Sequence, residues 1–287
     1  MKLTGLFLLL TVITIISGCG SSDGEKQAQY NFKQGLAELK IDLLENAPPE
    51  KIYPESDFPF IVELDNQAAY DIRNGELRIV GLDIAYFDIY PLSENFDLLG
   101  KSLTNPAGQK DYLEFSGRSG QLFENSEEHS ADFLLKAVYS SEVDFTDTIC
   151  INTDAYNIFD SGCTSEEAKS YFGQGAPVAV TSLEQIVSPG NAAELELRIK
   201  IENKGSGRVN RVVVETAQLG GELLTCIFNN AGQGVVYDFP EDEEKKQEVI
   251  LICKKSLRGQ RSYETTLSVA LRYDYELQEE KTLNLVK

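Results

Sequence analysis

Apolar and polar side chains alternate with a period of two residues along much of the chain. The longest alternating stretches are residues 194–202 and 263–275, and shorter ones occur at 39–43, 60–64 and 133–139. Successive side chains of a β-strand point to opposite faces of the sheet, so this period is typical of strands with one buried and one solvated face. The pattern predicts an all-β protein built mainly from antiparallel strands.

Two stretches of the chain are similar to one another and predict an internal duplication. The first, DFPFIVELDNQAAYDIRNGELRIVG, begins at Asp57, and the second, AELELRIKIENKGSGRVNRVVVE, begins at Ala193. In both, an alternating strand ends in an acidic residue and an asparagine, Asn66 or Asn203, and a short turn leads to another strand. Self-similarity of this kind indicates two copies of one structural module.

Each copy resembles the immunoglobulin-like β-sandwiches of cell-surface proteins, particularly adhesion-type modules in which a strand ends in an Asn-x-Gly-like turn. The second copy, with IENKGSG, fits this turn better than the first, where Gln67 and Ala68 replace the expected glycine. As a whole, residues 36–287 resemble secreted archaeal surface lipoproteins with tandem immunoglobulin-like domains. The stretches NAPPEKIYPESDFPFIVELDN, GQGAPVAVTSLE and LSVALRYDYELQEEKTLNLV carry this resemblance. It implies two tandem immunoglobulin-like β-sandwiches and a surface location, and it implies no activity.

One short helix is predicted near the junction between two domains. Thr164 and Glu167 form a capping box, and the helix is expected to continue to about Phe172. A short connector containing glycine and proline follows it. We therefore predict a first β-sandwich domain at residues 36–173 and a second at 177–287.

The beginning of the chain predicts secretion and a lipid anchor. Residues 3–18 are apolar or small and uncharged, and Lys2 precedes them, as in a secretory signal peptide covering residues 1–18. The following ISGC resembles the lipobox of secreted lipoproteins, which implies that Cys19 is the lipid attachment site. The polar residues 19–35 predict a flexible, lipid-attached tether. A retained membrane helix is the alternative, although a membrane span needs roughly 20 apolar residues.

The other four cysteines predict two disulfides. Their number is even, and the predicted secretion signal leads to an oxidising compartment. Of the three possible pairings we favour Cys150 with Cys163 and Cys226 with Cys253, because each pair then lies within one predicted domain. Four reduced, buried thiols are the alternative, and the spacings match no zinc motif.

The charge of the chain limits its partners. Lys and Arg number 26 against 46 Asp and Glu, which gives a formal net charge of −20. Such a surface repels phosphate backbones and anionic lipid headgroups, so we expect no nucleic-acid binding. Attachment to a membrane is then expected to depend on the N-terminal lipid or helix.

Candidate catalytic and cofactor residues are few. The sole histidine, His129, lies in the polar stretch NSEEHSADF and is interpreted as a solvated loop residue. The sequence contains no glycine-rich phosphate loop with its lysine. We therefore predict a protein that is not an enzyme and has no cofactor.

A calcium site is the alternative to a chain without metal. Asp144, Asp147, Asp154 and Asp160 lie around the loop that a Cys150–Cys163 disulfide would close. Calcium takes 6 to 8 oxygen ligands, and carboxylates gathered in a constrained loop can supply them. No EF-hand spacing is present.

The sequence thus predicts a cell-surface protein that binds rather than catalyses. The aromatic run IAYFDIYP, residues 84–91, is interpreted as core, with an exposed patch for a partner as the alternative. We predict a lipid-anchored protein on the extracytoplasmic face of the cell membrane, acting in binding, adhesion or envelope assembly with an unidentified protein or surface partner. A solute-binding lipoprotein and a purely structural spacer are the alternatives.

Overall fold

The structure is a computed structural model, which describes residues 31–123, 125–153, 162–188, 193–229, 234–240, 247–257 and 262–287. Residues 31–287 form one compact unit. The predicted signal peptide, Cys19 and residues 20–30 of the predicted tether lie outside the described residues, as do Asp154 and Asp160.

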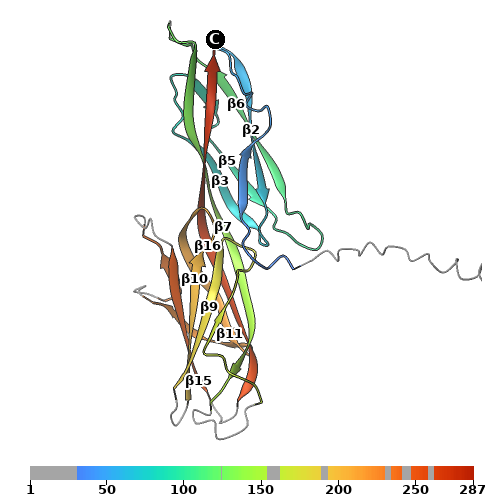
Figure 1. Cartoon of the computed structure of the whole chain (residues 1–287), viewed down its shortest axis with the longest axis vertical. Coiled ribbons are helices and arrows are strands. Elements are labelled where there is room, and N and C mark those ends of the chain that lie inside the picture. The colour runs from blue at the N-terminus through green and yellow to red at the C-terminus, as the bar shows by residue number, and fades with distance from the viewer. Residues whose placement is uncertain are drawn as a thin grey trace, which may run out of the picture. The chain divides into compact units, whose positions relative to one another are not determined.

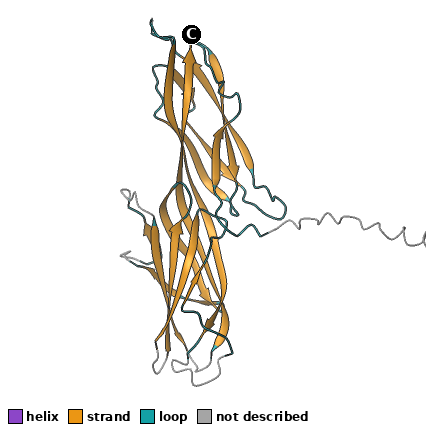
Figure 2. Cartoon of the chain, in the orientation of Figure 1, coloured by secondary structure: helices purple, strands orange, loops and turns teal. Residues whose placement is uncertain are grey.

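The regular elements of the described residues are all β-strands (Figure 2). The predicted all-β class is therefore confirmed. The strands are β1 (Leu39–Leu43), β2 (Asp57–Asn66), β3 (Ile72–Val80), β4 (Phe87–Tyr90), β5 (Ser93–Leu98), β6 (Lys110–Ser119), β7 (Glu128–Ile151), β8 (Ala168–Ser170), β9 (Val178–Ser188), β10 (Ala193–Asn203), β11 (Arg208–Leu219), β12 (Glu222–Leu223), β13 (Thr225–Phe228), β14 (Val236–Asp238), β15 (Glu248–Leu257) and β16 (Tyr263–Val286).

The strands form three antiparallel sheets (Figure 1). A four-stranded and a five-stranded sheet each pack against a seven-stranded sheet. The four-stranded sheet has the order β1-β2-β6-β4, and the five-stranded sheet has the order β13-β15-β10-β9-β8. The seven-stranded sheet has the order β12-β11-β16-β7-β3-β5, with β14 paired to β11. Phe60 of β2 packs on Phe133 of β7, with ring centroids 5.7 Å apart, and so joins the first sheet to the third. Phe228 of β13 and Tyr237 of β14, 5.8 Å apart, join the second to the third.

The strand order repeats between the two halves of the chain. The order β4-β6-β2-β1 in the four-stranded sheet corresponds to β13-β15-β10-β9 in the five-stranded sheet, which adds β8 at its edge. In the seven-stranded sheet, β5-β3-β7 corresponds to β14-β11-β16, and the two-residue strand β12 is an addition in the second half. The internal duplication predicted from the sequence is thus present in the topology.

The two halves meet along β7 and β16, which pair over 24 residues each. Tyr139 and Tyr275 are direct partners near the middle of this pair, and their rings lie 5.6 Å apart. On its other edge β7 pairs with β3 only between Leu134 and Ser140. The part of β7 that follows Ser140 therefore has no strand on this edge among the described residues.

The two asparagine turns of the repeat have the same hydrogen bonds. The Asn66 Oδ1 atom accepts from the backbone N–H of Ala68 (3.1 Å), and its Nδ2 donates to the backbone oxygen of Tyr70 (3.0 Å). Asn203 makes the equivalent bonds with Gly205 (3.1 Å) and Gly207 (2.7 Å). The glycine missing from the first copy is therefore not required, because the asparagine side chain itself closes the turn.

The predicted helix over residues 164–172 is wrong. Its middle residues form β8, which pairs with Ser182, Leu183 and Glu184 at the edge of β9. The Cys150–Cys163 disulfide ties the preceding segment to the end of β7. Backbone pairing to a sheet edge thus outweighs the local capping signal, which was the only argument for a helix.

Both predicted disulfides are present. Cys150 and Cys163 have Cα atoms 5.8 Å apart. Cys226 and Cys253 are direct partners on β13 and β15, with Cα atoms 4.0 Å apart. Cys253 is fully buried, as the alternation of β15 predicts.

Candidate functional site

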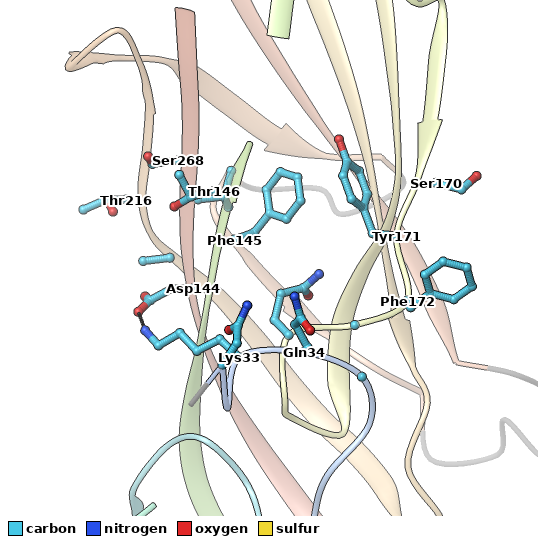
Figure 3. A pocket seen from close by; sticks show the side chains of 16 residues that line it. Lys33, Gln34, Asp144, Phe145, Thr146, Ser170, Tyr171, Phe172, Thr216 and Ser268 are labelled. Atoms are coloured by element: carbon cyan, nitrogen blue, oxygen red, sulfur yellow. Dashed lines mark hydrogen bonds and ion pairs between the residues drawn. The ribbon is translucent and has the colours of Figure 1, made fainter. Parts of the chain in front are cut away.

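A groove of about 1040 Å³ lies beside the edge of β7 that β3 leaves unpaired (Figure 3). Its lining comes from residues 31–35, from residues 144–146 of β7, and from residues 170–174 at and after the end of β8. Residues of β11 and β16 complete it. Five separate segments of the chain therefore build this site.

Small side chains on the outer face of the seven-stranded sheet contribute to the groove. Thr216 of β11 pairs with Ala270 of β16, which in turn pairs with Asp144 of β7. In the next row outward, Ser268 pairs with Thr146. Because these side chains are short, a ligand can approach the backbone of the sheet closely here.

An ion pair stands at one end of the groove. Lys33 Nζ lies 2.7 Å from Asp144 Oδ2 (Figure 3). It also lies 4.8 Å from the centre of the Tyr70 ring. Burial opposes the charge of Lys33, but the hydrogen bond to Asp144 and the negative charges of Asp144 and Glu142 outweigh it, so the pKa of Lys33 is raised. Lys33 therefore stays charged and holds the N-terminal segment against β7.

Tyr70 caps the backbone of β7 at Asp144. Its hydroxyl accepts a hydrogen bond from the Asp144 N–H (3.0 Å) and donates one to the Asp144 backbone oxygen (3.2 Å). Burial raises the pKa of Tyr70, so the hydroxyl keeps the proton that this double role needs. The edge-side backbone groups of Asp144 are thus satisfied.

The opposite wall is held by Tyr171 and Lys169. The Tyr171 hydroxyl donates to Asp147 Oδ2 (2.7 Å), and its ring packs edge-on against Phe145 with centroids 4.7 Å apart. Burial, followed by the bond to Asp147, raises the pKa of Tyr171, so the hydroxyl remains a donor. Lys169 Nζ reaches both Asp147 Oδ2 and the backbone oxygen of Thr148, each at 3.1 Å.

The two walls are joined at the base of the groove. Gly35 and Gln174 form a parallel β-bridge, and the Gly175 N–H donates to the Gly35 oxygen (2.8 Å). Gly173 has a φ of +117°, and a Cβ there would lie 2.5 Å from the Gly35 oxygen. Only glycine suits this position, because the φ is left-handed and the Gly35 backbone occupies the place of a side chain.

The predicted calcium ligands that the structure describes do not converge. Asp144 and Asp147 are an odd number of residues apart on β7 and so point to opposite faces of the strand. Each forms an ion pair with a lysine, Lys33 and Lys169 respectively. Within the described ranges, no three His, Cys, Asp or Glu side chains are grouped so that they could hold a metal ion. Asp154 and Asp160 are outside these ranges.

His129 lies in a strand and not in the predicted loop. It is the second residue of β7, and its ring stacks on Tyr86 with centroids 3.7 Å apart. Its Nε2 lies 3.3 Å from Asp83 Oδ2. The strand begins earlier than the polar stretch suggested, because β16 pairs with β7 back to Glu128.

The aromatic run is divided between core and surface. Tyr86 and Phe87 are buried, as the core interpretation predicts. Tyr90, at the end of the edge strand β4, is 76% exposed.

Sequence reasoning missed the groove. Lys33 fell within the predicted tether, and Tyr171 fell within the predicted helix. Tyr70 lay in the turn of the repeat, and its bond to a residue 74 positions away has no local signal. Only the pairing of distant strands brings these side chains together.

Comparisons with known proteins assign no family. No protein-family model matches the chain, and no curated protein matches it. The solved structure of the E. coli chaperone DraB matches at 13% identity and a TM-score of 0.22, over 80% of this chain and 86% of that chain. The secreted serine protease VesC from Vibrio cholerae matches at 10% identity and a TM-score of 0.22, over 85% of this chain and about half (51%) of the protease. At these TM-scores neither likeness supports a statement about fold or activity.

Among the residues that the structure describes, none forms a helix of the length and apolar character needed to cross a bilayer.

Proposed function

We propose that the chain is a non-enzymatic, lipid-anchored binding protein on the extracytoplasmic face of the cell membrane, where it acts in adhesion or envelope assembly. In this proposal each half is an immunoglobulin-like sandwich, and Cys19 carries the lipid.

The two disulfides support the location. Disulfides form and persist in oxidising compartments and are rare in the cytosol. Cys226–Cys253 joins adjacent strands inside the core, and Cys150–Cys163 anchors the segment that leads to the groove wall. A protein that is stabilised by two disulfides is suited to an oxidising compartment outside the cytoplasm.

The single observation that carries a binding role is the groove at the unpaired edge of β7. It combines a volume of about 1040 Å³ with a floor of small side chains and with walls fixed by ion pairs and hydrogen bonds. Such a preformed concave site has the properties of a binding site. The acidic charge of the chain favours a partner that is neutral or basic.

A structural spacer is the second candidate. The continuous pairing of β7 and β16 would make the two halves rigid with respect to each other, as a spacer requires. A spacer predicts that no partner raises the melting temperature, whereas a bound ligand raises it by mass action.

Membrane attachment tests the proposal. Cys19→Ser should release the full-length protein from the membrane fraction of producing cells, and Ser21→Ala, which leaves the cysteine intact, should not. If the Cys19→Ser variant stays in the membrane fraction at the wild-type level, the lipid anchor is wrong and a retained helix takes its place.

A further inference from the structure

The edge of β7 beside the groove presents backbone groups that no described residue uses. The Tyr70 hydroxyl is hydrogen-bonded to the N–H and C=O of Asp144, and Lys169 Nζ donates to the backbone oxygen of Thr148. Between them, the edge-side N–H and C=O of Thr146 have no hydrogen-bond partner in the part of the chain that the structure describes. An open strand edge of this kind is a template for one more strand.

We propose that the groove binds an extended segment of a partner polypeptide, which adds to the edge of β7 as a further strand beside Thr146. The proposal rests on the binding role proposed above and specifies the partner. Main-chain hydrogen bonds supply affinity in this mode of recognition, and side-chain pockets supply specificity.

The walls of the groove favour a single segment over a second sandwich. Residues 31–35 and 170–174 flank the edge of β7 and are fixed to each other through Gly35 and Gln174. Neighbouring strands lie about 4.8 Å apart, so one extended chain fits beside Thr146.

The side chains around the edge define the chemistry of the partner. Phe172 is 95% exposed at the rim and offers an aromatic surface to an apolar side chain. Glu142 is exposed on the same face of β7 as Thr146 and has no ion pair with another described residue. A segment with an apolar residue near Phe172 and a Lys or Arg on the side of Glu142, beyond the Tyr70 cap, complements both side chains.

A pair of variants at one position separates backbone binding from side-chain binding. Thr146→Pro removes the edge N–H, and its pairing to β16 survives because the lost donor points away from that strand. Thr146→Ala removes the side chain and keeps the N–H. The full-length wild type is used to select binders from a phage-displayed library of random short peptides, and a synthetic copy of a selected peptide is the probe.

The proposal predicts that wild type and Thr146→Ala bind the probe alike, whereas Thr146→Pro binds about tenfold more weakly, because at least one main-chain hydrogen bond is lost. The melting temperature of Thr146→Pro without peptide shows whether it is folded. If that variant is unfolded, hydrogen exchange of the Thr146 and Thr148 amides in wild type replaces it, with slower exchange expected when the probe is bound.

Three results overturn the proposal. The first is that the library yields no peptide that binds at the groove. The second is that Thr146→Pro and Thr146→Ala bind the probe equally well. The third is that the protein forms a dimer in solution that shields the Thr146 amide. The outcome is separable from the proposed location. A lipid-modified Cys19 without peptide binding rejects only the strand-addition site, and peptide binding with an unmodified Cys19 rejects only the anchor.

Discussion

Buried side-chain amides act as parts of the backbone in this protein. Gln174 accepts from the Val180 N–H (2.9 Å) and donates to the Val180 oxygen (3.1 Å), which is the pattern of a paired strand residue. Gln247 does the same with Val209, at 2.8 Å for both bonds. Asn66 and Asn203 close the two turns that link facing sheets. Asn203 is partly buried and the other three are buried. A buried amide is stable only when its donors and acceptors are satisfied, so each of these residues is tied to one geometry.

Removal of either turn amide should destabilise the fold. Asn66→Ala and Asn203→Ala each leave turn backbone groups without partners, and we expect a loss of about 1 to 3 kcal/mol in the free energy of unfolding. The loss should be larger for Asn66, whose side chain is fully buried. Denaturant unfolding measures both, with the exposed Asn95→Ala of β5 as the control, expected to stay within about 0.5 kcal/mol of wild type. Equal stability of all three variants would contradict the role assigned to the turns.

At the scale of strands, glycines are covered by phenylalanines from the neighbouring strand. Gly117 of β6 is the direct partner of Phe58 on β2, and Gly75 of β3 is the direct partner of Phe96 on β5. A Cβ on Gly117 would overlap the Phe58 ring, and one on Gly75 would lie 2.5 Å from the Phe96 ring. Each ring thus fills the space that a glycine leaves in its strand, which is known as aromatic rescue.

Gly117→Ala should therefore force Phe58 out of its position. Overpacking of this kind costs about 1 to 3 kcal/mol, and Phe58 is buried and packs against Phe87 with centroids 6.3 Å apart. The matched control is Gly162→Ala, where a Cβ would meet no atom within 4 Å. Thermal unfolding should show a lower melting temperature than wild type for Gly117→Ala and an unchanged melting temperature for Gly162→Ala. A Gly117→Ala protein as stable as wild type would show that the ring moves freely.

The sequence predicts a strand only where apolar and polar residues alternate regularly along it. It predicts the part of β16 up to Tyr275, where apolar residues occupy every second position. It misses the last part, where Glu279 and Lys281 occupy positions of the inward face, and Lys281 is stabilised there by Asp42 at 2.8 Å. The sequence also predicts a helix where β8 lies, because a three-residue strand depends on pairing with its neighbour β9 and not on its own composition.

At the scale of the molecule, two copies of one strand order share a sheet along β7 and β16. The repeat and the disulfides could be predicted because their signals are local: an asparagine after a strand, and cysteines in an even number. The groove could not, because Lys33, Tyr70 and Tyr171 are brought together only by the pairing of distant segments. The unpaired edge of β7 is a result of the same arrangement, since β7 extends beyond the end of β3 to pair with β16.

The mass of the protein isolated from the membrane fraction of producing cells tests the proposed function most directly. We predict a chain that begins at Cys19, carries a lipid on that residue and lacks four hydrogens, as two disulfides require. Tandem fragmentation should place the lipid on the first residue. A chain that retains Met1 and an unmodified Cys19 would contradict the account.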